Sequence, residues 1–410
     1  MRRALLALLA LLASGAGAEP RPAAGGVELF RALERAPLAA VAVFGAPTAL
    51  DGESYAAVAT LEVVLRGEGR VGETLELAWE ELSPVRPVRF AAGDRVLLAV
   101  ERLPGASIWR QRIADPQRLA RTRSVARSGD AFVRSPALGS VRLLEHFLAL
   151  PPELRDANPG VAHLIRLAEG AQPVLAGAAL DRLAEVPDLD AALDPVSAGR
   201  LVAVLLRDPP SLGDAVLRIV ARSRPSELRE PLRFRAPADG MGPAPVYRAL
   251  AVLDGSLDAP LTRSLFARHD SPAHRAVAAR HADASQRGEL ARRLRSDGSA
   301  EVRAAAVTRL AELDGAAALD RLLFALGDPD LEVRHAAMQA VSGLGATAVP
   351  GLREVVDYGT PEAARTAVGA LRACGPEGAR ALRTVANTHP DASVRLLAET
   401  ALGGSIGHKH

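Results

Sequence analysis

The apolar positions of this chain follow two different periods, one in each half. Within residues 27–135, apolar and polar residues alternate, as at 74–80, where Leu75, Leu77 and Trp79 share one face. Four short runs of this kind are present: 41–43, 60–66, 74–80 and 96–100. Turns that contain glycine separate them. The alternation predicts a small all-β barrel or sandwich over 27–135.

From residue 143 to 403 the apolar spacing is that of helices. The clearest stretch contains Val333, Ala337 and Val341, which share one face of a 3.6-residue helix. We expect Asp328 to cap the start of this helix, with Pro329 in its first turn. Gly345 stands where the helix is expected to end, so the helix boundaries are readable from the sequence.

The helical pattern repeats about every 31 residues. Two series of apolar positions carry the repeat: Leu310, Val341, Leu371 and Leu402 at intervals of 31, 30 and 31, and Leu322, Leu352 and Leu382 at intervals of 30 and 30. Each copy therefore predicts two helices joined by a turn. Such a hairpin cannot bury its apolar face alone, so successive copies must stack. We expect an all-α solenoid over 143–403, with clear copies from about 270.

A polar phrase marks each copy. It reads Asp-Pro-Asp-x-x-Val-Arg-x-Ala-Ala at 328–337, with related copies at 297–306 and 389–398, and Leu344-Gly345 follows it. The phrase resembles the short HEAT repeats of bacterial proteins, the type also found in phycobilisome-lyase-like proteins. One copy departs from it, because Ala364 takes the arginine position. We expect the other Val-Arg arginines to form a structural ladder of Asp–Arg contacts between repeats.

The resemblance implies that the second helix of each hairpin lines the concave side of the solenoid. Arg353 and Arg383 lie on consecutive second helices, 30 residues apart. They are therefore candidate partner-binding residues that stack on one face. A solvated surface without a ligand is the alternative interpretation of the same spacing.

The order of strands and turns in the first half, from Val41 to Gly93-Asp94, resembles the OB-like barrel of netrin/TIMP-type modules. The animal inhibitors of that family use an N-terminal cysteine, which this sequence lacks. The resemblance therefore implies the barrel fold and does not imply metalloprotease inhibition.

The N-terminus has the pattern of a secretory signal peptide. Arg2 and Arg3 precede an apolar run at 4–13, and Ala16-Gly17-Ala18 forms a cleavage site. We expect cleavage of residues 1–18 and a periplasmic or secreted product. No later run of 18 apolar residues predicts a membrane span. The glycine-rich end, 404–410, is predicted to be a disordered tail.

Charge excludes some partners. The chain has 50 basic and 48 acidic residues, and removal of Arg2 and Arg3 with the signal peptide leaves 48 of each. This balance and an aromatic content of 3% argue against nucleic acid as a partner. A local exception is the arginine-rich segment 110–134, with arginines at 110, 112, 118, 121, 123, 127 and 134. It is either a site for an acidic envelope polymer or a solvated hairpin.

No motif in the sequence predicts catalysis, a metal site or a cofactor. The nine histidines lack compact metal-ligand spacing, and the single cysteine, Cys374, falls on a core position of the repeat. We therefore predict an exported, non-catalytic scaffold that binds a protein partner through the repeat surface. The candidate binding residues are Arg353, Arg383, Arg110 and Arg112. A lyase-like enzyme and a binder of acidic polymers are the alternatives.

Overall fold

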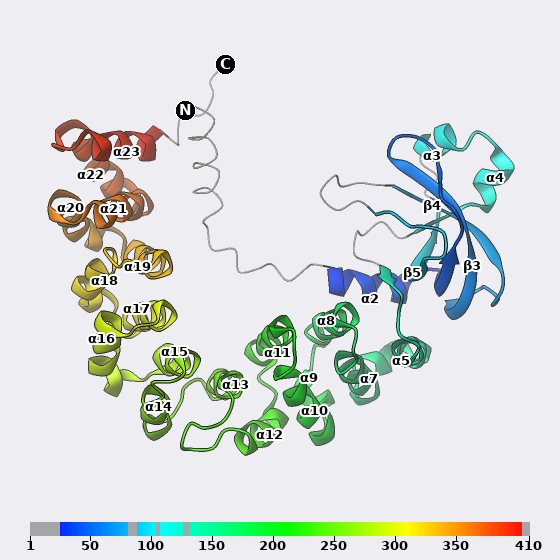
Figure 1. Cartoon of the computed structure of the whole chain (residues 1–410), viewed down its shortest axis with the longest axis horizontal. Coiled ribbons are helices and arrows are strands. Elements are labelled where there is room, and N and C mark those ends of the chain that lie inside the picture. The colour runs from blue at the N-terminus through cyan, green and yellow to red at the C-terminus, as the bar shows by residue number, and fades with distance from the viewer. Residues whose placement is uncertain (1–24, 81–87, 104–106, 126–131, 404–410) are drawn as a thin grey trace. The chain divides into compact units, whose positions relative to one another are not determined.

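The computed structural model describes residues 25–80, 88–103, 107–125 and 132–403, and Figure 1 shows the arrangement of its elements. The chain divides into two compact units, Met1–Pro231 (unit 1) and Leu232–His410 (unit 2). The predicted signal peptide 1–18 and the predicted tail 404–410 lie outside the described residues.

Unit 1 contains a closed barrel of five strands. Its strands are β1 (Leu38–Phe44), β3 (Ser54–Gly67), β4 (Thr74–Glu80), β5 (Arg95–Arg102) and β6 (Arg123–Val125). They pair in the order β1-β3-β4-β6-β5, and β1 also pairs with β5, which closes the ring. The β4–β6 pairing is parallel and the others are antiparallel. The predicted all-β barrel is confirmed.

Short elements complete the barrel. Strands β2 (Thr48–Ala49) and β7 (Phe132–Arg134) pair with β3 and β5, and helices α3 (Ser107–Arg112) and α4 (Pro116–Arg121) lie between β5 and β6 in the chain. The alternating apolar face fills the interior, where Phe44, Trp79 and Phe90 form an aromatic cluster with ring centroids 4.4–5.9 Å apart. Pairs at these distances stabilise the core beyond the effect of burial alone.

The rest of unit 1 is helical, including a segment that the sequence analysis assigned to the β domain. Residues Gly25–Arg35 form helix α2, whose Leu29, Phe30 and Leu33 are buried. This helix packs against α8 (Pro173–Leu183) and, through an edge-to-face contact of Phe30 with Phe147, against α5 (Leu138–Ala149). The remaining helices of this part are α6 (Pro152–Arg155), α7 (Asn158–Ala168), α9 (Leu189–Ala192), α10 (Pro195–Leu205) and α11 (Pro210–Ser223).

The packing of α2 joins the barrel to the first helices. Helix α2 precedes β1 in the chain, yet the Arg182 side chain of α8 binds Glu34 of α2 at 3.1 Å and Asp156 at 2.7 Å. The barrel thus contacts α2, which precedes its strands in the chain, and α5, which follows them. Along the chain, the boundary between the two compact units falls at Pro231/Leu232.

Unit 2 is a stack of helical hairpins. The first helices of the hairpins are α13 (Ala244–Asp254), α15 (Pro272–His281), α17 (Ala300–Asp314), α19 (Leu331–Gly343), α21 (Pro361–Ala373) and α23 (Ala392–Gly403). The second helices are α14 (Ala259–Phe266), α16 (Arg287–Ser296), α18 (Leu319–Ala325), α20 (Val349–Tyr358) and α22 (Gly375–Thr388). Helix α12 (Arg229–Phe234) spans the boundary between the units. The predicted all-α solenoid is confirmed.

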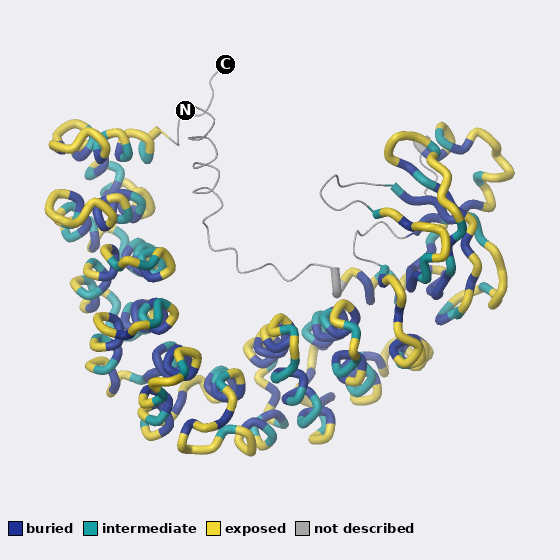
Figure 2. Tube along the Cα trace, viewed as in Figure 1, coloured by how far each residue is buried: buried dark blue, intermediate teal, exposed yellow. Residues whose placement is uncertain are grey.

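The predicted repeat register agrees with burial. Val302 and Val333 are 0% exposed, as are Leu322 and Leu352 of the second helices. Figure 2 shows the buried sides of the helices meeting along the stack. Cys374 is buried in the same core, with its thiol 3.3 Å from the Ala370 carbonyl. The interior of the solenoid was therefore readable from the two apolar series.

The helix caps differ in part from the prediction. Gly345 follows α19 with φ +59°, a left-handed conformation that glycine adopts without steric cost. The N-cap of α19 is Asp330, which accepts a hydrogen bond from the Glu332 N–H at 2.9 Å, and α19 begins at Leu331. Asp328 is not the cap, because its carboxylate binds Arg303 and the Asp330 N–H instead.

The first helices line the inner side of the curved stack in unit 2, which we call the inner face (Figure 1). They pack directly against one another, α15 on α17 and α17 on α19. The second helices α14, α16, α18 and α20 lie on the opposite side, the outer face. Helix α22 packs against α20 and continues this row of second helices. The expectation that second helices line the concave side is therefore wrong. Arg353 lies on α20, which is a helix of the outer face.

Candidate interaction surface

Arginines at the Val-Arg position of the phrase connect consecutive repeats. Arg275 occupies this position in a looser copy, where it follows His274. Arg275 of α15 binds the carboxylate of Asp297, before α17, with two hydrogen bonds of 2.9 Å. Arg303 of α17 binds Asp328, before α19, in the same way at 2.8 and 2.9 Å. Arg303 also donates to the Asp297 carbonyl at 2.8 Å. Bidentate pairs of this kind fix the spacing of neighbouring hairpins. The predicted structural ladder is confirmed for these two steps.

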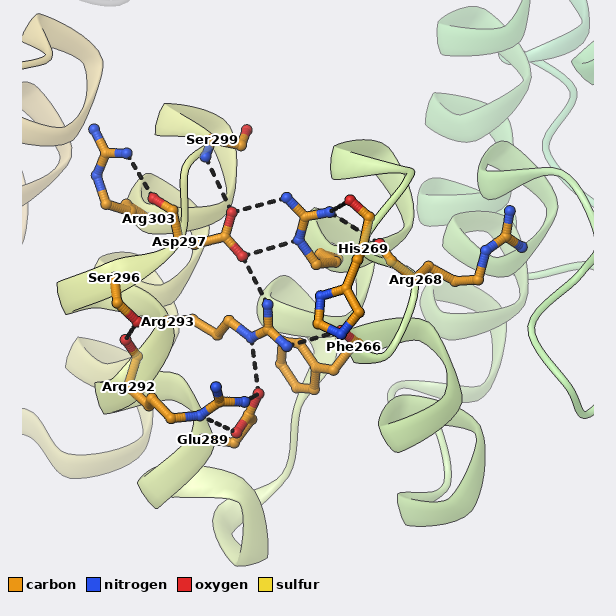
Figure 3. Close-up of polar contacts among 11 residues, drawn as sticks. Phe266, Arg268, His269, Glu289, Arg292, Arg293, Ser296, Asp297, Ser299 and Arg303 are labelled. Carbon is orange, nitrogen blue, oxygen red and sulfur yellow. Dashed lines mark hydrogen bonds and ion pairs between the residues drawn. The ribbon is translucent and has the colours of Figure 1, made fainter.

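Asp297 is the centre of a buried polar cluster (Figure 3). Its side chain is 1% exposed and accepts hydrogen bonds from Arg275, from Arg293 at 2.9 Å and from the Ser299 N–H at 3.0 Å. Burial raises the pKa of this carboxyl, but the hydrogen bonds from Arg275, Ser299 and Arg293 outweigh it and lower the pKa to about 2. Arg293 also donates to the Phe266 carbonyl at 2.8 Å. Asp297 thus holds two hairpins together.

The ladder ends where the sequence departs from the phrase. Arg334 donates to the carbonyls of Asp328 and Pro329 at 2.7 and 2.9 Å. The next first helix, α21, starts after Thr360, whose hydroxyl caps it by accepting from Ala363 N–H at 3.2 Å. No aspartate stands there to receive Arg334. The ladder arginines are accordingly structural groups in the interior of the stack.

Arg112, a predicted binding residue, is a structural part of the barrel. Its side chain is 14% exposed and forms ion pairs with Asp51 at 2.6 Å and with Glu80. Its guanidinium also lies over the Trp109 ring, 5.4 Å from the centroid. The N–H donors of Arg112 therefore bind carboxylates of the barrel itself. Arg110, by contrast, is exposed and has no ion pair with the residues that the structure describes.

Most other arginines of the segment 110–134 are likewise used within the barrel. Arg118 pairs with Glu76 at 2.5 Å, and Arg134 lies over the rings of Phe90 and Phe132 and 3.5 Å from Asp94. Arg123 donates to nearby backbone carbonyls. Arg121 is exposed, and Arg127 lies outside the described residues. The local excess of positive charge in the sequence is therefore largely balanced in the fold.

The two predicted residues of the second helices differ from each other. Arg353 is 25% exposed, pairs with Asp357 at 3.2 Å and donates to the Ala381 carbonyl at 3.3 Å. Arg383 of α22 is exposed and forms no ion pair among the described residues. Helix α20 contacts α22, so the two residues do occupy neighbouring repeats as expected. Their role in binding stays a prediction.

The first helices, which line the inner face, carry a different set of charged and polar residues. Glu301, Glu332 and Glu362 stand exposed in the first turns of α17, α19 and α21. A second row, deeper in each helix, consists of Arg248, Arg280, Thr308 and Gln339. These four residues lie 32, 28 and 31 positions apart, so the repeat spacing of the first helices was a signal that would have found them. This row was not predicted, because the candidate binding residues of the solenoid were placed on the second helices.

Arg280 differs from the ladder arginines. It is half-buried on α15 and forms no ion pair or hydrogen bond with the residues that the structure describes. Burial lowers its pKa, as does the nearby charge of Arg248, whereas Glu301 and Glu332 raise it. Glu332 belongs to α19, two first helices away. The guanidinium of Arg280 therefore lies close enough to α17 and α19 for one glutamate of each helix to act on it.

His281, the next residue, is held neutral. Its Nε2 atom is closed to solvent and has no hydrogen-bond partner among the residues that the structure describes. Burial lowers its pKa to about 4, and the positive charges of Arg280, Arg309 and Arg248 act in the same direction. Arg309 is fixed beside it by hydrogen bonds of 2.7 Å to the Ala282 carbonyl and to Glu312. The site thus contains positive charge around a neutral imidazole.

We expect unit 2 to lose stability in mild acid because of His281. Its pKa is about 4 in the folded chain and about 6.5 in an unfolded one, so below pH 6.5 the unfolded chain binds the proton first. The free energy of unfolding should fall by about 2 kcal/mol between pH 7 and pH 5. In His281→Leu this loss should be absent, measured by urea unfolding followed by circular dichroism. His269→Leu, at an exposed histidine, is the control that keeps the loss. Equal pH dependence in all three proteins would contradict the assignment.

The described residues contain no other candidate centre of chemistry. No group of three or more His, Cys, Asp or Glu side chains in these ranges has the arrangement of a metal site. Burial raises the pKa of the Cys374 thiol, which disfavours the thiolate needed for reactivity. Among the helices that the structure describes, none combines the length and apolar character needed to cross a membrane.

Comparison with known proteins identifies the repeats. The model of HEAT repeats matches residues 286–372, which include α16 to α20 and most of α21. No curated protein matches the chain. Among solved structures, human deoxyhypusine hydroxylase in complex with glycerol is similar at 18% identity and a TM-score of 0.26, over 60% of this chain and 95% of that one. A TM-score this low supports no inference. The C-terminal region thus carries HEAT repeats, as predicted.

Proposed function

We propose that the protein is an exported, non-catalytic scaffold that binds a protein partner on the inner face of unit 2. HEAT repeats commonly mediate protein interactions, and solenoids use their extended concave surfaces for binding. One observation carries the choice of face. The ladder arginines of the interior are saturated by carboxylates and carbonyls, whereas the inner face presents Arg280 without a partner among the described residues.

Other features support the remaining parts of this proposal. The charged and apolar pattern of residues 1–18 supports export. The polar cluster around Asp297 supports a structural rather than a catalytic role for the buried charges, because its members satisfy one another. The closed barrel with a parallel β4–β6 pair supports the OB-like type for the first domain.

The alternatives have less support. Binding of an acidic polymer through the segment 110–134 would depend on Arg110 and Arg121, because Arg112, Arg118 and Arg134 already bind carboxylates of the barrel. No observation favours a lyase-like enzyme.

The proposal is tested by position-specific cross-linking in the cells that make the protein. A photoreactive amino acid replaces Gln339 on the inner face or Thr384 on the outer face, both of which are exposed. We expect one discrete cross-linked species from position 339 and none from position 384. The reason is that a bound partner covers only the surface that it contacts.

Two further variants locate the surface independently. Arg353→Glu with Arg383→Glu changes the outer face, and Arg110→Glu with Arg121→Glu changes the exposed part of the arginine-rich segment. Both should leave the cross-link at position 339 intact. Two results would place the binding surface elsewhere than on the inner face. One is cross-linking from position 384 alone, and the other is loss of the cross-link from position 339 in either double variant.

A further inference from the structure

The inner face contains an arginine whose charge is not balanced by the fold. Arg280 is half-buried, and its guanidinium lies near the positive charge of Arg248. Glu301 and Glu332 are close enough to affect it but form no ion pair with it. Removing a charge from water without pairing it is unfavourable. The unpaired charge of Arg280 therefore lowers the stability of the folded chain.

A second unsatisfied group lies beside this arginine. The Nε2 atom of His281 is closed to solvent and has no hydrogen-bond partner in the described part of the chain. Buried polar atoms are nearly always paired, so an orphan next to an unpaired arginine marks an incomplete polar site. Both residues end the same helix, α15, and Arg309 of α17 lies near His281. The site lacks a hydrogen-bond acceptor that carries negative charge.

The flanking charges narrow the kind of anion that fits. The glutamates Glu301 and Glu332 are exposed in the first turns of α17 and α19, act on Arg280 and repel an extended polyanion. A single carboxylate matches the planar guanidinium, which binds such groups through two parallel hydrogen bonds. Basic side chains on either side of that carboxylate would in turn face the glutamates. Charge complementarity thus points to a protein segment with mixed charge.

We propose that Arg280 is the docking point for one carboxylate side chain of a partner protein, in a segment whose neighbouring basic residues face Glu301 and Glu332. This inference rests on the proposed function of the inner face and specifies the chemistry of the partner. Arg280 is then the residue that fixes the position of the partner along the stack. The partner's carboxylate also supplies the negative charge that the site around His281 lacks.

The direct test is binding of a designed peptide to the mature chain, residues 19–410. The probe is a labelled 12-residue peptide with one central glutamate and lysines on both sides, compared with the same peptide carrying glutamine. We expect the glutamate peptide to bind at least 10-fold more tightly than the glutamine peptide. Arg280→Gln should remove that difference, and Arg280→Lys should restore part of it. Arg383→Gln, at an exposed arginine of the outer face, should leave it unchanged.

Two additional measurements separate a binding role from a structural one. Arg280→Gln should raise the melting temperature by about 2 °C, since it removes an unpaired, partly buried charge, whereas Arg275→Gln should lower it. The His281 ring, followed by NMR, should titrate at higher pH when the glutamate peptide is bound, because a nearby negative charge favours the imidazolium.

Several results would overturn the inference. These are equal binding of both peptides, an equal effect of Arg280→Gln and Arg383→Gln, or competition by inorganic phosphate as strong as by the glutamate peptide. If Arg280→Gln has no effect on peptide binding while position 339 still cross-links, the scaffold function stands and the docking point is wrong. If the peptide depends on Arg280 while position 339 gives no cross-link, the site stands and the scaffold function fails.

Discussion

Replacement of Asp297 by alanine is expected to destabilise unit 2 by about 3–5 kcal/mol, the range observed when one partner of a buried ion pair is removed. The carboxylate of Asp297 binds Arg275 and Arg293, and the two arginines are 7% exposed. Without it, two buried guanidinium groups lose their counter-charge at once. The measurement is urea unfolding followed by circular dichroism at neutral pH.

The matched control is Asp320→Ala, which removes an exposed carboxylate from the first turn of α18. It should cost less than about 1 kcal/mol, the usual range for a charge near a helix N-terminus. Acid provides a second check. The folded pKa of Asp297 is about 2, below its unfolded value of 3.8, so its stabilisation is present above pH 3.8 and disappears as the pH falls toward 2. A loss in Asp297→Ala no greater than in the control would show that the cluster does not stabilise the stack.

Replacement of Val333 by aspartate is expected to cost about 4 kcal/mol or more. Val333 is 0% exposed between the helices of neighbouring hairpins, and an unpaired charge there has no partner and no access to water. Because each hairpin of a solenoid contacts only its neighbours, the damage should concentrate around α17, α19 and α21. Thermal melting and hydrogen exchange measure the size and the place of the loss.

Leu331→Asp is the matched control, because it places the same charge in the first turn of the same helix at a side chain that is 71% exposed. A negative charge there interacts favourably with the helix dipole, so stability should change by less than about 1 kcal/mol. Equal melting temperatures for the two variants would show that the repeat register is wrong.

The periodic parts of the fold were predictable because their cause is local. A helix that buries one face must place apolar residues every three or four positions, and a hairpin that stacks on a copy of itself must repeat the pattern. Val333, Leu322 and Leu352 were placed in the core on this ground, and they are buried. The alternation around Trp79 predicted the barrel for the same reason.

Helix α2 shows where local reasoning was incomplete. Leu29, Phe30 and Leu33 have helical spacing, but the segment is short and precedes a series of strands. It was therefore assigned to the β domain. Its partner is α8, about 150 positions further along the chain, as the contact of Glu34 with Arg182 shows. A pairing over that distance cannot be predicted from the local spacing of apolar residues.

The candidate site depended most on tertiary structure. By sequence alone, Arg112 and Arg353 were candidate binding residues, and Arg280 was not distinguished from the other arginines of the chain. The fold brings Asp51 and Glu80 to Arg112 and brings Asp297 to Arg275, and it leaves Arg280 without a counter-charge among the described residues. It also puts the first helices on the inner side of the stack. The sequence by itself determined the elements, the repeat and its core, because these follow from burial at regular spacing. Only the tertiary structure decided which charges are neutralised and which face is available to a partner, because ion pairs form between residues that the chain order keeps apart.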